Sequence, residues 1–204
     1  MNFEVIDNIF QICVLLCVMV AAFVCGIRRK DRRCLILGLA YACFAMGTLY
    51  FVLHIVIMGV PPQIFYVAEV SWLASYLFYL LLLMMESGQE MRRVSWKAFV
   101  PSLAAAAVVW EDEIFGPSPV MCLLFALTAG AIVYRSVSSL ERKEGNWKLH
   151  VNLLICVGLQ LLLYRVSDFI RDYTRFNLYF AVDFLLTGSF AALLPLTVRE
   201  VKHS

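Results

Sequence analysis

The sequence predicts an all-α membrane protein, and composition is the first reason. Of the 204 residues, 62% are hydrophobic and only 16% are charged, with a mean hydropathy of +0.82. Soluble domains carry about 45–50% apolar and about 25% charged residues. The apolar residues also come in blocks close to the roughly 20 residues that a helix needs to cross a bilayer. We therefore expect one multi-pass domain, residues 1–204, in the plasma membrane.

The blocks are recognised in order by their length and their flanks. The first has acidic residues before it and a basic cluster after it, which is typical of a retained span rather than a cleavable signal peptide. The fourth is short and holds Pro101, but Ser95 can cap its start, and Trp96 and Trp110 mark its ends as interfacial aromatics do. Fewer spans would leave an apolar run in water. The seven expected spans are residues 9–26, 35–58, 64–85, 97–111, 118–135, 149–170 and 176–197.

Lysine and arginine predict the orientation. The connections after the first, third and fifth spans and the C-terminal tail hold fourteen of them, whereas the opposite side holds only Arg171 and Arg175. Basic residues concentrate in cytoplasmic loops of membrane proteins. The N-terminus is therefore expected outside and the C-terminus in the cytoplasm.

Charged residues inside the predicted spans are the main functional signal. Arg165 and Asp168 lie near the outer end of the sixth span, and Asp183 lies about two turns into the seventh. Charges within a bilayer are costly, and they mark function unless they pair with one another. An ion pair of Arg165 with Asp168 or Asp183 that only holds two helices together is the structural alternative.

The same predicted depth is polar in two further spans. His54 lies near the outer end of the second span, and Glu69 lies near the outer end of the third with Trp72 one turn below it. Five ionisable side chains from four spans thus share one layer, which favours a polar, outward-facing pocket. Aromatic faces beside carboxylates can also hold an organic cation. The residues expected to bind a ligand are His54, Glu69, Trp72, Arg165, Asp168, Asp183, Tyr50 and Tyr164.

An internal repeat is suggested by an offset of 114 residues, which places His54 on Asp168 and Glu69 on Asp183 without a gap. It implies two parallel three-helix units, residues 1–86 and 118–204, joined by the span at 97–111. This layout resembles bacterial-type seven-span membrane proteins of 3+1+3 architecture, the SWEET and PQ-loop transporters, and the topology of rhodopsin-like receptors. Parallel repeats of this kind are known to frame solute sites.

This sequence lacks the motifs of those families. The seventh span has no lysine, so a retinal Schiff base is excluded, and the Pro-Gln of "PPQ" at 61–63 lies in an outer turn rather than at the cytoplasmic end of a span. The resemblance therefore implies topology and carries no functional residue over.

Three classes of function are compatible with these features. The first is a sensor or receptor-like protein that binds a small polar or cationic solute and signals through a cytoplasmic partner. The second is a small proton- or cation-coupled transporter, and the third is an intramembrane hydrolase acting on a lipid through paired acids. The chain has no "GxSxG" or "HExxH" and only three histidines. We therefore predict no catalytic residue, no metal, no cofactor and no nucleic-acid partner, with the lipid bilayer as the surroundings.

Overall fold

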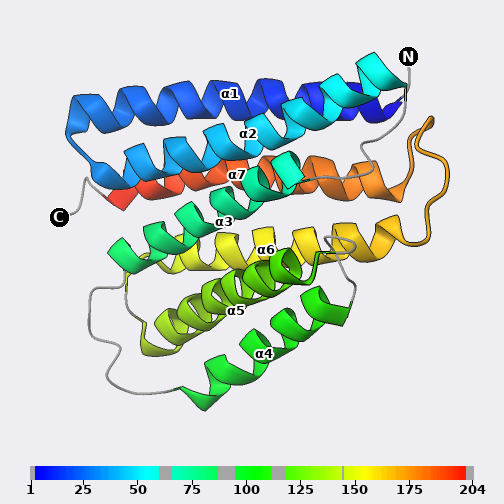
Figure 1. Ribbon diagram of the computed structural model, residues 1–204. Helices are drawn as coiled ribbons and strands as arrows, with labels where there is room; N and C mark the ends of the chain where they lie inside the picture. Colours follow the sequence, from blue (N-terminus) through cyan, green and yellow to red (C-terminus); the bar gives the residue numbers. More distant parts are fainter. Residues whose placement is uncertain (1–2, 60–65, 87–94, 112–117, 144, 201–204) are drawn as a thin grey trace.

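The chain forms a bundle of helices, as the apolar blocks predict. The computed structural model describes residues 3–59, 66–86, 95–111, 118–143 and 145–200 (Figure 1). Over these ranges seven helices lie side by side: α1 (Phe3–Arg29), α2 (Arg32–Met58), α3 (Tyr66–Glu86), α4 (Trp96–Glu111), α5 (Pro119–Arg142), α6 (Trp147–Ser167) and α7 (Leu178–Glu200).

Six of these described helices are long and apolar enough to cross a membrane, so the protein is a multi-pass membrane protein. The helix outside this group is α4, the predicted fourth span. Its 16 residues rise about 24 Å at 1.5 Å per residue, which is shorter than a bilayer core of about 30 Å. A seventh crossing through α4 therefore stays a prediction.

The helix boundaries lie within three residues of the predicted spans except at the start of α1 and at the end of α5, which continues to Arg142 instead of ending at residue 135. Helix α1 begins at Phe3 instead of residue 9, and this extra turn and a half brings Asp7 into the helix. The buried face of α1 carries Asp7, Gln11 and Leu15 at intervals of four residues. Residues four apart lie one above the other on a helix, so the two polar side chains face the bundle.

The chain runs back and forth along the bundle, and the start of α1 and the end of α7 lie at opposite ends of it (Figure 1). We call these the N-terminal end and the C-terminal end of the bundle. The α1–α2 and α5–α6 connections lie at the C-terminal end. Which end faces the cytoplasm stays a prediction from the basic residues. Some features used in the sequence analysis fall outside the described residues: "PPQ" at 61–63, Arg92, Arg93, Lys202 and His203.

Short polar side chains start several helices. The carboxylate of Asp31 accepts the backbone N–H of Arg33 at the start of α2, and the Asn146 side chain accepts the N–H groups of Lys148 and Leu149 at the start of α6. The predicted cap of the fourth block is confirmed, since Ser95 Oγ accepts the N–H of Ala98 at 3.3 Å. Such side chains satisfy N–H groups that have no partner within the helix.

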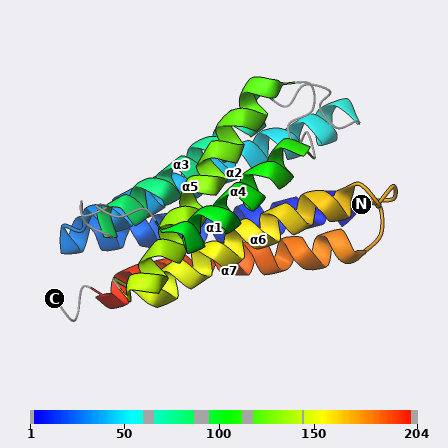
Figure 2. The same cartoon turned by 90° about the horizontal axis from the view of Figure 1, so that it is seen from below.

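Helix α4 packs chiefly on α5 at one edge of the bundle (Figures 1 and 2). Ser102 of α4 donates its hydroxyl to the carbonyl of Gly130 of α5 at 2.7 Å. A Cβ on Gly130 would lie 3.3 Å from Ser102, so the small residue allows the close approach of the two helices. Small residues at helix contacts are the usual way in which membrane helices associate.

The remaining helices form two sets of neighbours of the same kind. Helix α1 lies against α2 and α7, and α2 lies against α3; likewise α5 lies against α6 and α3, and α6 lies against α7. These three pairs of contacts match one another, whereas the contact of α2 with α7 has no counterpart of similar extent between α6 and α3. The predicted repeat of residues 1–86 and 118–204 is compatible with the three matching pairs and stays a prediction.

The centre of the bundle is aromatic. Tyr41 of α2 donates its hydroxyl to the carbonyl of Phe190 of α7 at 2.7 Å, and Tyr79 of α3 stacks on the Phe190 ring with 5.5 Å between centroids. Tyr76 and Phe125 meet edge to face at 5.1 Å. These large buried rings fill the space between α2, α3, α5 and α7. Polar groups lie on both sides of this aromatic layer.

Candidate functional site

A buried polar cluster joins the first and last helices on the N-terminal side of the aromatic layer. Gln11 of α1 donates from Nε2 to both carboxylate oxygens of Asp183 of α7, at 3.1 Å each. The same nitrogen lies 3.1 Å from the hydroxyl of Thr187, one turn further along α7. All three side chains are buried. The amide therefore provides Asp183 with hydrogen bonds that water would provide at a surface.

Helices α2 and α3 extend this cluster. Thr48 of α2 donates its hydroxyl to Gln11 Oε1 at 3.0 Å, and Trp72 of α3 approaches Thr48 Oγ1 with its Nε1 at 3.5 Å. Gly47 leaves room for the indole, because a Cβ there would lie 2.8 Å from Trp72 Nε1. Polar contacts at one place thus connect four helices. We call Asp7, Gln11, Thr48, Asp183 and Thr187 the acid cluster.

Asp7 is the residue of the acid cluster whose side chain lacks hydrogen-bond partners among the described residues. It lies one turn before Gln11, and only 1% of its surface is exposed. Neither of its buried carboxyl oxygens has a hydrogen-bond partner among the residues that the structure describes. Its carboxyl group is close enough to that of Asp183 for a direct electrostatic interaction, with Glu4 also contributing. A buried acid beside another acid, without a donor, requires a positive charge or a proton.

Four residues of the predicted ligand site lie in or next to this interior. Asp183 and Glu69 are 6% and 5% exposed, and Trp72 is half-buried against Thr48. Glu69 of α3 lies near Tyr164 of α6, and its Oε2 has no hydrogen-bond partner among the described residues. About two turns further along α3, Tyr76 donates its hydroxyl to Gln160 Oε1 of α6 at 3.0 Å. A second buried acid therefore lies between α3 and α6.

The other four predicted residues lie elsewhere. Arg165 and Asp168 are exposed at the end of α6, and Arg165 forms an ion pair with Glu111 of α4 at 3.4 Å. His54 is half-buried near the end of α2 with its ring 6.4 Å from that of Tyr50. The structure thus separates the expected layer into an interior set of acids and a peripheral set.

Sequence reasoning missed Asp7 and Gln11 as members of the site. A hydropathy criterion starts a span after the last charged residue, which places Asp7 in the flank of the first span. The signal that could have found both residues is their spacing of four in register with Leu15, which places all three on one helix face.

Three carboxyl groups, those of Asp7, Asp183 and Glu69, are buried in the interior. The ion pairs of Arg33, Lys97 and Arg165 are made with other acids, namely Asp31, Glu86, Glu141 and Glu111. The described residues also bring no three histidine, cysteine or carboxylate side chains together as metal ligands.

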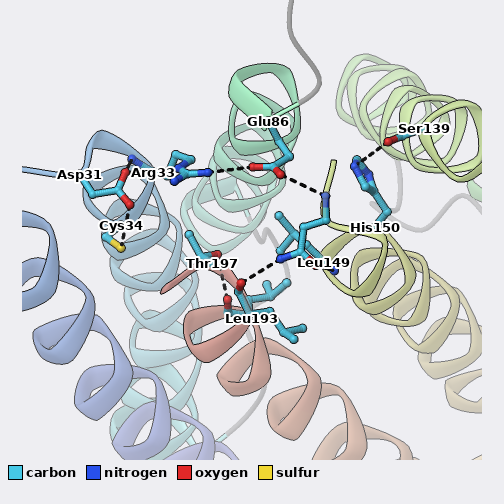
Figure 3. A network of polar contacts seen from close by, with 11 residues as sticks. Asp31, Arg33, Cys34, Glu86, Ser139, Leu149, His150, Leu193 and Thr197 are labelled. Carbon is cyan, nitrogen blue, oxygen red and sulfur yellow. Dashed lines mark hydrogen bonds and ion pairs between the residues drawn. The ribbon is translucent and has the colours of Figure 1, made fainter. Parts of the chain in front are cut away.

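A second polar network lies at the C-terminal end of the bundle (Figure 3). Glu86, the last residue of α3, accepts from Arg33 Nη1 of α2 at 3.1 Å and from the backbone N–H of Asn146 at 3.2 Å. Asn146 donates its side chain to the carbonyl of Leu196 of α7 at 2.9 Å. Contacts around one carboxylate thus connect α2, α3, α6 and α7.

A histidine is buried beside this network. Nε2 of His150 on α6 lies 2.8 Å from the hydroxyl of Ser139 on α5, and none of the His150 surface is exposed. The pair ties α5 to α6 next to the network around Glu86. The C-terminal end of the bundle is therefore held together by polar contacts among five helices, to which α7 contributes the carbonyl of Leu196.

The comparisons with known proteins identify no family. The chain matches no family model, no curated protein and no solved structure. The functional argument therefore rests on the geometry of the acid cluster.

Proposed function

We propose that this multi-pass membrane protein binds a small cationic solute at the acid cluster and acts as a sensor or receptor. The observation that supports the proposal is Asp7, a buried carboxyl group with no hydrogen-bond donor among the described residues and an acidic neighbour. A bound cation would neutralise this group at a place where burying an unpaired charge is costly. Ionisable residues within membrane helices are functional in most cases.

The surroundings favour an organic cation such as an amine. The indole of Trp72 lies next to the cluster, and the ring of Tyr179 lies within electrostatic range of Asp7 and Asp183. Aromatic faces attract cations and exclude water from them. The hydroxyl groups of Thr48 and Thr187 add acceptor oxygens for the hydrogen atoms of an ammonium group.

The sensor reading draws on the helices that carry the two polar networks. Helix α3 bears Glu69 on one side of the aromatic layer and Glu86 at its other end, and α7 bears Asp183 and the Leu196 carbonyl. A solute that shifts α3 or α7 at the acid cluster would alter the contacts around Glu86. Such a shift at the predicted cytoplasmic end would be passed to a partner protein. Allosteric coupling of this kind requires two arrangements of the same element.

A proton- or cation-coupled transporter is the second candidate. The partly symmetric neighbour pattern of α1–α3 and α5–α7 favours it, because related three-helix units can move against each other around a central site. A transport measurement distinguishes the transporter from the sensor. Uptake of labelled amine into proteoliposomes, lost in Asp183→Asn, would select the transporter, whereas binding without uptake would select the sensor.

Thermal unfolding of the purified protein tests the binding itself. The probes are ethanolamine, tetraethylammonium and spermidine, with glucose as an uncharged comparison. A solute at about a hundred times its dissociation constant stabilises the folded state by roughly 2.7 kcal/mol. We expect a higher melting temperature with at least one amine and none with glucose.

Matched variants assign the effect to the site. The shift should disappear in Asp183→Asn and in Asp7→Asn, which keep the side-chain shape and remove the charge. It should persist in Glu111→Gln, because Glu111 is an exposed acid paired with Arg165 away from the cluster. A shift that survives in Asp183→Asn and Asp7→Asn, or no shift with any amine, would contradict the proposal.

A further inference from the structure

The two buried carboxyl groups of the acid cluster must also be balanced in charge when no solute is bound. Two carboxyl groups, Asp7 at 1% and Asp183 at 6% exposure, face each other from α1 and α7. If both were ionised, two like charges would repel each other in a region of low dielectric constant. Each would also have lost its hydration.

The hydrogen bonds distinguish the two carboxyl groups. Asp183 accepts two bonds of 3.1 Å from the Gln11 amide, an arrangement that favours the ionised form. Asp7 accepts none from the residues that the structure describes. An acid that receives no donor but lies against a carboxylate is placed to donate a proton to it. An O–H···O⁻ bond would then replace the repulsion between the two groups.

We propose that Asp7 and Asp183 form a proton-binding pair in which one proton is held between the two carboxyl groups, with Asp7 as the donor and Asp183 as the acceptor. Paired carboxylic acids that share a proton behave as one titrating unit. The pair then carries a single negative charge in place of two. All five polar side chains of the acid cluster have a hydrogen-bond partner in this arrangement.

The groups around the pair are consistent with retention of the proton. Glu4 on α1 adds a further negative charge nearby, and Tyr179 of α7 and Tyr76 of α3 lie within electrostatic range. Helix α2 contributes Thr48, whose hydroxyl group does not ionise near neutral pH. None of these side chains supplies a positive charge that would favour loss of the proton.

The shared proton would compete with a bound solute, and this consequence, unlike the proton itself, rests on the proposed function. A bound cationic solute and the shared proton would neutralise the same two carboxyl groups. Binding of the solute would therefore release the proton, and a lower pH would weaken solute binding. The existence of the proton does not depend on any solute, so the two proposals can fail separately.

Infrared spectroscopy of the purified full-length protein, without added solute, tests the shared proton. The C=O stretching band of a protonated carboxylic acid is expected in the wild type near neutral pH. Asp7→Asn should reduce this band by the intensity of one carboxylic acid, because the remaining Asp183 carboxylate keeps its bonds from Gln11 and stays ionised. The band should be unchanged in Glu111→Gln. The same band intensity in wild type and Asp7→Asn, or no such band in the wild type, would overturn the proposal.

The pH dependence of unfolding provides a second, independent measurement. The amide that Asp7→Asn introduces can donate an N–H to Asp183 at every pH, so this variant imitates the protonated state. The melting temperature of the wild type should fall as rising pH removes the proton, and that fall should be smaller in Asp7→Asn. Identical pH profiles would overturn the proposal, even if amines still stabilise the protein.

Discussion

Gln11 near the start of the chain and Asp183 near its end are joined by two hydrogen bonds of 3.1 Å, from one amide nitrogen to both oxygens of one carboxylate. The residues are 172 positions apart in the sequence. The contact fixes α1 against α7 in the bundle interior. It also determines which of the two neighbouring acids has its hydrogen bonds satisfied.

Replacement of Gln11 by alanine should destabilise the protein. Asp183 would lose both N–H donors and remain buried, and an unsatisfied buried polar group costs about 1–3 kcal/mol, or more when charged. The measurement is the unfolding free energy in detergent. Asn8→Ala is the matched control, because the Asn8 amide bonds only to the carbonyl of Glu4 in its own helix among the described contacts. An equal loss in both variants would contradict the role assigned to Gln11.

Much of the fold could be predicted from hydropathy because bilayer thickness imposes a length on each apolar block. All seven predicted blocks contain a helix, and the Ser95 cap was predicted from a local pattern. The pairing of charges was harder to predict. Arg165 contacts Glu111 across the α4–α6 contact, which depends on how helices are placed around the bundle. Periodicity indicates which face of a helix is buried but does not identify its neighbour.

The residues of the candidate site were likewise predicted only in part. Glu69 and Asp183 were predicted as residues of a ligand site because an acid within a long apolar run is conspicuous, and both are buried in the structure. Asp7 and Gln11 were missed because they lie near a helix end, where polar residues are ordinarily solvated. In this bundle the first turns of α1 are covered by α7 and by the α6–α7 connection.

Gly47→Ala should weaken the contact between α2 and α3. The added Cβ would lie 2.8 Å from Trp72 Nε1 and 3.0 Å from the backbone carbonyl of Ala68, so the helices would have to separate. Overpacking of this kind typically costs about 1–3 kcal/mol. The melting temperature should fall, with a change in tryptophan fluorescence.

Gly188→Ala is the control for this substitution. A Cβ at Gly188 of α7 would meet no atom within 4 Å, so only the higher helix propensity of alanine remains. We expect the melting temperature of this variant to stay the same or to rise. A fall as large as that of Gly47→Ala would mean that helix packing is not the cause.

Asn146 should prove to have two separable roles at the start of α6. Asn146→Ala removes the cap for Lys148 and Leu149 and the bond to the Leu196 carbonyl. Loss of such a cap typically costs about 1 kcal/mol. Asn146→Ser keeps a neutral acceptor for the cap and loses the amide that donates to Leu196. Unfolding free energies should therefore rank wild type, Asn146→Ser and Asn146→Ala in descending order, and the reverse order of the two variants would contradict this assignment.

The connection between α6 and α7 should respond to acid through Asp172. The hydroxyl and the backbone N–H of Thr174 donate to Asp172 Oδ1 at 2.6 and 2.9 Å, and these bonds lower the pKa of Asp172 below its ordinary value of 3.8. A carboxyl group with a lowered pKa stabilises the folded connection above its ordinary pKa. That contribution is lost as the pH falls through the lower folded value.

Carboxyl-carbon NMR of Asp172 measures this directly. Thr174→Val removes the hydroxyl and keeps the backbone N–H, so the pKa of Asp172 should rise toward its ordinary value without reaching it. Thr174→Ser keeps the hydroxyl and should leave the pKa of Asp172 as it is in the wild type. If Thr174→Val leaves it unchanged as well, the hydroxyl is not the cause of the lowered pKa.

The backbone contacts of α1 have a consequence for biosynthesis. The N–H groups of Phe3 and Glu4 donate to the carbonyls of Thr174 and Tyr173 in the α6–α7 connection. Because a chain is made from its N-terminus, α1 would enter the membrane when these carbonyls, Asp183 and Thr187 have not yet been synthesised. The polar face of α1 would therefore lack these hydrogen-bond partners until α7 is inserted.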